Sequence, residues 1–233
     1  MKILLVRVGV DQSREGGGWN APVNLTTREF AYVAIPESHD VVRGTERSYE
    51  SPDLLAELRK FGVPLPQHLR GRHMHLDPDF ERCTYGDQGR RASQLRILEP
   101  RDMIVFYAGL RAPDQGQLVY ALIGQLTVEQ IKRAGDIADR DMNAHTRRRQ
   151  VRPDDLVVIG SHSGSGRYAL CIPIGEYRDR AYRVRRDLLD AWGKISIKDG
   201  YLQRSGHLPT MLQPAQFHHW LTEQDVALVR RNY

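Results

Sequence analysis

Residues 103–126 read MIVFYAGLRAPDQGQLVYALIGQL, and they indicate the fold class more clearly than any other part of the chain. Two apolar runs in this stretch, Met103 to Ala108 and Leu118 to Leu126, are rich in β-branched and aromatic residues, which is typical of strands. The segment between the runs contains a proline, an aspartate and a glycine, which favour a turn. This part of the chain therefore predicts two strands joined by a turn.

Hydrophobic periodicity in the rest of the chain predicts an α+β protein with a mixed β-sheet core and flanking helices. Further strands are expected over residues 2–8, 31–35, 156–159 and 167–174. Helices are expected over residues 52–60, 88–98, 127–134, 184–192, 214–221 and 222–231, which makes the C-terminal region mainly helical. Because no internal repeat or low-complexity linker divides the sequence, we expect one domain over residues 1–233. A helical C-terminal subdomain beginning near residue 178 is the alternative.

Composition narrows the class of protein. The 233 residues are 40% apolar, enough for a packed core, and no apolar run approaches the roughly 18 residues of a membrane-spanning helix. Residues 1–10 lack the small-residue cleavage site of a signal peptide. Two cysteines, Cys83 and Cys171, cannot make a disulfide framework or a thiolate zinc site. These features favour a cytoplasmic protein that does not interact with membranes.

The charge is basic and is carried mainly by arginine. The formal net charge is +5 and the sequence pI is about 9.3, and only five of the 34 basic residues are lysine. The planar guanidinium group of arginine binds phosphate through two hydrogen bonds, so this bias suits a phosphate-bearing partner. A GC-rich genome would favour arginine codons as well, and both explanations stay open.

A first polar cluster follows the opening strand. It runs from Arg7 through Asp11 to the glycines at positions 16–18. A strand that ends in a flexible glycine loop can expose backbone N–H groups that hold a phosphate. The pattern matches neither the P-loop nor the dinucleotide-binding fingerprint, so an ordinary surface loop is the favoured interpretation.

A second polar cluster, HMHLDPD over residues 73–79, alternates polar and apolar side chains. Alternate residues of an extended segment share a face, so His73, His75, Asp77 and Asp79 are expected to point together. Such a set predicts a divalent metal site, in which the carboxylates favour magnesium or manganese and the histidines a transition metal. The same carboxylates could instead act as general acid and base, or pair with neighbouring arginines at a turn.

Two further clusters contain arginine. Residues 143–149 read NAHTRRR and place His145 before three arginines that could meet a nucleic-acid backbone, although a charge run is more often a solvated loop. The segments 161–167 and 199–206 set hydroxyl residues and glycine beside Arg167 and Arg204, as phosphate sites often do. The absence of a G-x-S-x-G motif argues against a serine-hydrolase triad.

Taken in order, these clusters resemble the nucleotide modification associated domain family, third type. The resemblance runs along nearly the whole chain, and its most specific parts are His75 to Phe80 and Thr84 to Asp87. It also includes Arg7-x-Gly9-x-Asp11, Tyr32-x-x-Ile35-Pro36, Asp102 to Leu110, Tyr120 to Gly124, Asn143-x-His145-x-Arg147 and Ser165 to Arg167. The resemblance implies a role near systems that modify bases in DNA or their nucleotide precursors.

The residues and the resemblance together define the expected site. The candidate catalytic residues are Asp11, His75, Asp77, Asp79, Asp87 and His145. The candidate metal ligands are His75, Asp77 and Asp79, and the candidate phosphate-binding residues are Arg7, Arg147, Arg148, Arg167 and Arg204. The expected partners are a nucleotide or a nucleic acid, DNA rather than RNA, together with the proteins of a DNA-modification system.

Residues 102–128 are also similar to the paired strands of PUA and EVE domains, which bind modified bases or RNA and are not always enzymes. Three functions therefore stay open. The first is a metal- or carboxylate-dependent enzyme that acts on a base, nucleoside or nucleotide. The second is a binding module in which Tyr107 stacks on a modified base. The third is a structural partner in a modification complex.

Overall fold

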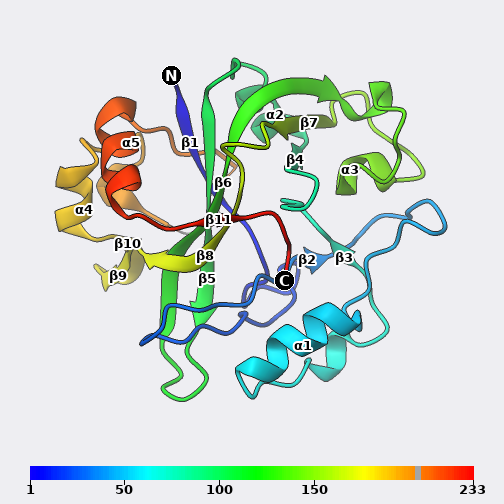
Figure 1. Cartoon of the computed structure of the whole chain (residues 1–233), viewed down its shortest axis with the longest axis horizontal. Coiled ribbons are helices and arrows are strands. Elements are labelled where there is room, and N and C mark those ends of the chain that lie inside the picture. The colour runs from blue at the N-terminus through cyan, green and yellow to red at the C-terminus, as the bar shows by residue number, and fades with distance from the viewer. Residues whose placement is uncertain (203–205) are drawn as a thin grey trace.

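A computed structural model describes residues 1–202 and 206–233 of the chain. It confirms the α+β class, with a mixed seven-stranded sheet at the centre and helices around it (Figure 1). The strand order is β1-β5-β6-β7-β4, and β8 pairs with β6 while β11 pairs with β8.

The predicted strand pair is the centre of this sheet. β5 (Met103–Arg111) and β6 (Leu118–Arg133) are antiparallel, and β1 (Ile3–Arg7) lies parallel to β5. The other edge of β6 pairs first with β8 (Gly166–Pro173) and then with β7 (Leu156–Gly160). β4 (Thr84–Asp87) pairs with β7 and ends the sheet on that side.

The remaining elements surround the sheet. The helices are α1 (Pro52–Lys60), α2 (Gly89–Leu95), α3 (Ala144–Arg147), α4 (Arg186–Ala191) and α5 (Pro214–Glu223). Two short strands, β2 (Ile35–Pro36) and β3 (Met74–His75), pair with each other, as do β9 (Gly175–Arg178) and β10 (Ala181–Val184). β11 covers Leu228–Val229. Residues 63–72 contain a single 3₁₀ turn, Gln67–Leu69.

Both faces of the central strands are buried, which explains their nearly continuous apolar sequences. Along β5, Val105 packs in one cluster with Trp192 and Phe217, which come from the region of α4 and α5. Its neighbour Phe106 packs in a second cluster on the opposite face, with side chains from residues 21–98. The sheet therefore separates a C-terminal helical layer from the layer that carries the polar clusters.

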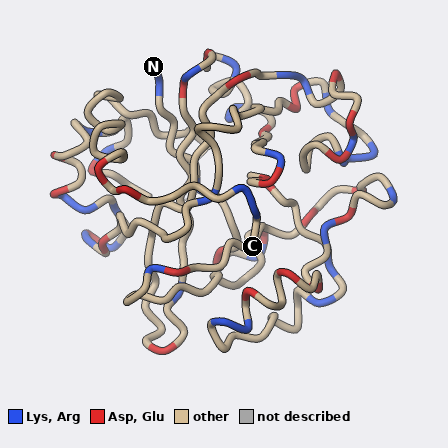
Figure 2. Tube along the Cα trace, viewed as in Figure 1, with Lys and Arg blue, Asp and Glu red and all other residues tan. Residues whose placement is uncertain are grey.

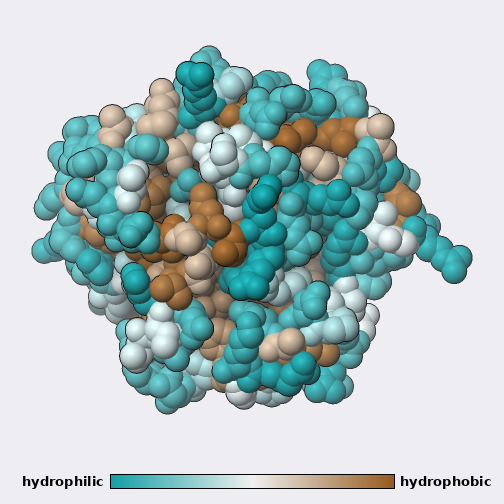
Figure 3. All heavy atoms as spheres, in the orientation of Figure 1, coloured by the Kyte–Doolittle hydropathy of each residue, from teal (hydrophilic) through white to brown (hydrophobic). Residues whose placement is uncertain are grey.

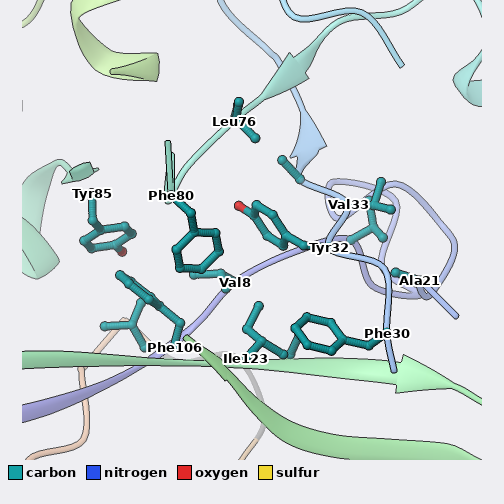
Figure 4. Close-up of a cluster of buried hydrophobic side chains, with 14 of the residues drawn as sticks. Val8, Ala21, Phe30, Tyr32, Val33, Leu76, Phe80, Tyr85, Phe106 and Ile123 are labelled. Atoms are coloured by element: carbon teal, nitrogen blue, oxygen red, sulfur yellow. The ribbon is translucent and has the colours of Figure 1, made fainter. Parts of the chain in front are cut away.

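The second core cluster supports the polar segments directly. The rings of Tyr32, Phe80 and Phe106 meet edge to face, with centroids 5.3 and 5.8 Å apart, and Tyr85 lies 5.3 Å from Phe106 (Figure 4). Leu76 also packs in this cluster. Since neighbouring residues of an extended segment point to opposite sides, anchoring Leu76 in the core directs His75 and Asp77 away from it.

Two predicted helices are wrong. Residues 127–134 resemble a capped helix, yet β6 continues through them and pairs with β7 from Val128 to Arg133. Residues 222–231 leave α5 at Glu223 and become extended, and β11 pairs with β8. In both places a neighbouring strand supplies backbone partners, which outweighs local helix propensity. The C-terminal region therefore contains α4 and α5 but also three short strands.

The surface carries mixed charge. Basic and acidic residues alternate along the trace (Figure 2), and the largest apolar area seen in Figure 3 lies left of centre, where the chain leaving α5 crosses the sheet. Cys83 and Cys171 are both buried and free. In the described part of the chain, none of the helices has the length and hydropathy needed to cross a bilayer.

Candidate functional site

Three polar side chains from two segments of the chain converge beside the sheet. Among the described residues, His75, Asp77 and His145 form one group whose potential ligand atoms all lie within 4.8 Å of one another. Nε2 of His75 lies 3.9 Å from Asp77 Oδ2, and Nε2 of His145 lies 3.6 Å from the same oxygen. Asp77 and His145 are buried, and His75 is partly exposed.

Each histidine is held from behind by a carboxylate. His75 Nδ1 lies 2.7 Å from Glu37 Oε2, and His145 Nδ1 lies 2.9 Å from Asp155 Oδ1. Because a carboxylate accepts hydrogen bonds, each ring donates from Nδ1 and turns Nε2 toward Asp77. This carboxylate–histidine arrangement is typical of metal-binding histidines.

Hydrogen-bond donors hold the carboxylate of Asp77 in place. The Gly86 N–H lies 2.9 Å from both carboxylate oxygens, and Asn143 Nδ2 donates to Oδ1 at 3.0 Å. The side-chain oxygen of Asn143 also accepts the His145 N–H at 2.9 Å, which caps α3. Asn143 thus joins Asp77 to the helix that carries His145, and this fixes the distance between the two side chains.

Burial sets the protonation of this group. It raises the pKa of Asp77 to about 7 and lowers the pKa of His145 to about 4, because each charged form is poorly solvated there. Burial also opposes ionisation of Glu37 and Asp155, but their hydrogen bonds to His75 and His145 outweigh it and lower both pKa values to about 2. Above the pKa of Asp77, the carboxylate faces the neutral ring of His145 with no proton between the two acceptors, and a cation would relieve their repulsion.

The distances also suit a metal ion. Ligands at about 2.1 Å from one ion lie roughly 3.0–3.4 Å apart, so the separations of 3.6 and 3.9 Å need small side-chain shifts. The two histidines, whose ligand atoms lie within 4.8 Å of each other, would also move closer together. The three residues could therefore hold a divalent metal. They lie in the wall of a cavity of about 200 Å³ that Arg7, Asp87, Arg91 and Arg148 also line.

The family model for nucleotide modification associated domain 3 matches residues 2–205 of the 233. The chain belongs to this family. His75, Asp77 and His145 all lie inside the matched range, as do Glu37, Asn143 and Asp155. No curated protein and no solved structure gives a significant match.

The segment after Asp77 does not continue the extended conformation that the sequence predicts. The alternation was expected to bring His73 and Asp79 beside His75 and Asp77. His73 is instead exposed, β3 ends at His75, and Asp79 begins a turn that bridges to Thr84. Asp79 binds Arg147 Nη2 at 2.9 Å instead and does not line the cavity. The structure therefore gathers His145, rather than Asp79, with the other two residues.

Asp11 and Asp87 lie in different surroundings. Asp87 lines the cavity, accepts the Tyr85 hydroxyl at 2.5 Å and pairs with Arg91 at 3.0 Å. Asp11 pairs with Arg7 at 3.3 Å and accepts the Ser13 N–H at 2.9 Å. In that glycine loop the N–H groups of residues 16 and 18 bind Ser13, so the loop is folded on itself rather than opened toward a phosphate.

Most of the candidate phosphate-binding arginines are already engaged. Arg148 lines the cavity but binds Asp155 at 2.8 Å, and Arg147 is buried against Asp79 and Asp141. Arg167 is 3% exposed, with its guanidinium group 5.0 Å above the ring of Phe30. Arg204 lies outside the described residues. Of the run 147–149, Arg149 alone is exposed.

Sequence reasoning missed the residues that orient the ligands, Glu37, Asn143 and Asp155. Glu37 follows β2 and Asp155 precedes β7. In the sequence each is an ordinary charged residue beside a strand, and no pattern around it indicates a role at the site. Asn143 did carry one, because Asn143 and Thr146 have the spacing of a reciprocal helix cap, and both of its hydrogen bonds are formed.

Asp155→Asn should weaken metal binding about 10- to 100-fold, because the amide no longer secures the Nδ1–H form of His145. Isothermal titration with Mn²⁺ measures the change. Asp114→Asn, in the exposed β5–β6 turn, is the matched control and should bind like the parent. Equal affinities for the two variants would show that Asp155 does not orient a ligand.

Gly86→Ala should damage the same site through sterics. A methyl group at Gly86 would lie 2.7 Å from Asn143 Oδ1 and closer still to the ring of His145, so the ring must shift. We expect a loss of about 1–3 kcal/mol in the free energy of unfolding, together with weaker metal binding. Gly135→Ala is the control, since its nearest neighbour would lie 4.0 Å away. Normal metal binding by Gly86→Ala would contradict the close packing.

The C-terminal segment buttresses the turn after Asp77. The Asn232 side chain is 2% exposed, accepts the Phe80 N–H at 2.8 Å and donates to Asp79 Oδ1 at 3.1 Å. Asn232→Ala should cost about 1–3 kcal/mol of unfolding free energy, because it leaves two buried groups without this partner. Urea denaturation measures this cost, and an unchanged midpoint would show that the segment does not support the turn.

Proposed function

We propose that the protein is a metal-dependent enzyme that acts on the base of a nucleotide or nucleic acid. The observation that supports this most strongly is the convergence of His75, Asp77 and His145, with Glu37 and Asp155 behind the two rings. Family membership supports the involvement of nucleotides. A metal held here would act as a Lewis acid and activate a bound water.

The donor set favours a transition metal. Two imidazole nitrogens with one carboxylate suit manganese, iron or zinc, whereas magnesium prefers oxygen ligands in octahedral geometry. Of the two metals expected from the sequence, manganese therefore fits better. Two histidines and one carboxylate would leave other coordination positions of a metal free for water or substrate, and all three residues line the cavity.

The charge around the cavity favours the base over the phosphate. Five carboxylates belong to the site or make a charged contact with a residue of it. They are Asp11, Glu37, Asp77, Asp87 and Asp155. Three guanidinium groups, Arg7, Arg91 and Arg148, pair with three of them. A divalent cation balances the two remaining negative charges, which leaves no excess of positive charge to hold a phosphate.

The size of the cavity supports the same proposal. Its volume of about 200 Å³ is below the roughly 300–1,000 Å³ of pockets that enclose whole drug-sized ligands. A base fits such a space better than a complete nucleotide does. Enzymes that modify bases commonly take the base alone into a pocket and leave the sugar–phosphate backbone outside.

The metal half of the proposal is tested by titrating chelator-treated protein with Mn²⁺, Fe²⁺ and Zn²⁺. We expect one equivalent of metal to bind to the parent and none to His145→Ala. His219→Ala, which removes a histidine whose side chain is 77% exposed, should bind like the parent. Equal metal binding by His145→Ala and the parent would remove the proposed centre.

The substrate half is tested by incubating the metal-loaded protein with nucleosides, nucleotides and oligonucleotides and analysing the bases by mass spectrometry. A change of mass in a base that requires His145 supports the enzyme. Inhibition by inorganic phosphate, together with cleavage of phosphodiester bonds, would contradict action on the base. Binding of modified oligonucleotides without metal or turnover would favour the non-catalytic module.

A further inference from the structure

The β9–β10 hairpin concentrates arginine at the surface. Residues 178–186 read RDRAYRVRR, with five arginines and one aspartate in nine positions. Arg180 and Arg186 are exposed, and Arg183 is partly exposed, in contrast to the buried Arg147 and Arg148. The hairpin lies on the far side of the sheet from α3 in Figure 1. This segment therefore offers accessible positive charge that the run at 147–149 does not.

Tyrosine rings accompany these arginines. Tyr177 and Tyr182 lie opposite each other on β9 and β10, with ring centroids 5.2 Å apart, and Tyr177 is 66% exposed. Arg183 lies 5.7 Å above the ring of Tyr201, which is 38% exposed. Within the described residues, five large apolar or aromatic side chains are exposed, and two of them are Tyr177 and Tyr201. Exposed rings beside arginine are the usual surface for stacked, unpaired bases.

A chain of contacts connects this hairpin with the cavity wall. Tyr182 stacks on Tyr120 of β6 with centroids 4.8 Å apart, and the guanidinium group of Arg7 lies 5.2 Å above Tyr120. Arg7 also lines the cavity of the candidate metal centre. These contacts place the ring of Tyr177 within about 15 Å of the Arg7 guanidinium. Because Tyr120 is buried, a strand would follow the surface around these rings, and so would need more than the roughly four nucleotides, at about 3.4 Å each, that the direct distance takes.

We infer that the substrate is a single strand of nucleic acid that places one base in the cavity and its flanking nucleotides on the β9–β10 hairpin. The inference rests on the proposed function, since it assigns the polymer to that same cavity. Tyr177 stacks on a flanking base, and Arg180 and Arg186 contact phosphates. A single strand fits because its bases expose their faces, whereas those of a duplex are stacked on one another.

The test measures the affinity of a fluorescent 12-nucleotide single-stranded DNA at several salt concentrations. Tyr177→Ala should weaken binding about 10-fold, and Tyr177→Phe, which keeps the ring, should bind like the parent. Arg180→Ala with Arg186→Ala should lower the slope of log affinity against log salt by about 1.4, since each phosphate contact contributes about 0.7. Arg149→Ala, an exposed arginine away from the hairpin, is the matched control.

Several results would overturn the inference. These are parent-like binding by Tyr177→Ala and the double arginine variant, equal affinity for a nucleoside and the 12-mer, or tighter binding of the duplex than of the single strand. His145→Ala separates this inference from the proposed function. It should lose metal and turnover but still bind the 12-mer. If the parent binds the strand through the hairpin and holds no metal, the proposed centre fails while the docking surface stands.

Discussion

Asp77→Asn should abolish metal binding and leave the metal-free protein at least as stable as its parent. The carbonyl oxygen of the new amide can still accept from Gly86 N–H and Asn143 Nδ2, which lie 2.9 and 3.0 Å from Asp77. Its NH₂ group then replaces Oδ2, which faces the Nε2 atoms of both histidines. The NH₂ group can donate to Nε2 of the neutral His145 ring, whereas the Gly86 N–H keeps its bond to the carbonyl oxygen and loses the one to Oδ2. No cavity forms, because the amide is nearly isosteric with the carboxylate.

The pH dependence of stability gives this variant a clear signature. Burial raises the pKa of Asp77 to about 7, whereas an aspartate in the unfolded chain titrates near about 3.9. Between these values the folded protein holds a proton that the unfolded chain has released, so the metal-free parent loses stability as the pH rises. Asp77→Asn has no such loss. Its advantage should be small near pH 4 and reach about 1–4 kcal/mol above pH 7.

Melting temperature and Mn²⁺ affinity, measured on both metal-free proteins from pH 4 to pH 8, check this prediction. The lowered pKa of His145 acts in the opposite direction, but it is present in both proteins and largely cancels in the comparison. Metal affinity in Asp77→Asn equal to that of the parent would remove Asp77 from the centre. A variant that is less stable than the parent at every pH would contradict the arrangement of acceptors.

Arg147→Ala should destabilise the protein by about 3–5 kcal/mol. Arg147 Nη2 binds Asp79 Oδ2 at 2.9 Å and Nε binds Asp141 Oδ1 at 3.0 Å, and the Arg147 side chain is 3% exposed. Its removal leaves the carboxylate of Asp79, which is 2% exposed, buried without its cation. Asp79 and Arg147 each lie two residues from a candidate ligand, so metal binding should weaken as well.

Urea denaturation of Arg147→Ala and Arg149→Ala makes the comparison. Arg149 is exposed, and replacing it should change the unfolding free energy by no more than about 0.5 kcal/mol. The sequence alone left two roles open for these arginines, a solvated loop or contact with a nucleic-acid backbone, and in both of them both variants fold normally. Equal stability of the two variants would restore that interpretation and contradict the buried ion pair.

Local patterns were sufficient for several features of this protein. Residues 103–108 and 118–126 form paired strands as the apolar runs on either side of one turn predict, because a hairpin needs only near neighbours. His75 and Asp77 share a face because alternate residues of an extended segment do so wherever that segment lies. Their side chains already identified a candidate metal site, and the ordered motifs identified the family.

Only the tertiary structure selected the third member of that site. His145 reaches Asp77 because α3 packs against β4, and Gly86 leaves room for its ring. Asp79 has the spacing of a ligand, but the turn that starts there directs its carboxylate to Arg147. The same packing determines which arginines are buried with carboxylates and which remain at the surface. Which of these side chains meet depends on contacts between residues far apart in the chain. The geometry of those contacts is set by how the sheet and its covering layers pack, and not by the identity of neighbouring residues.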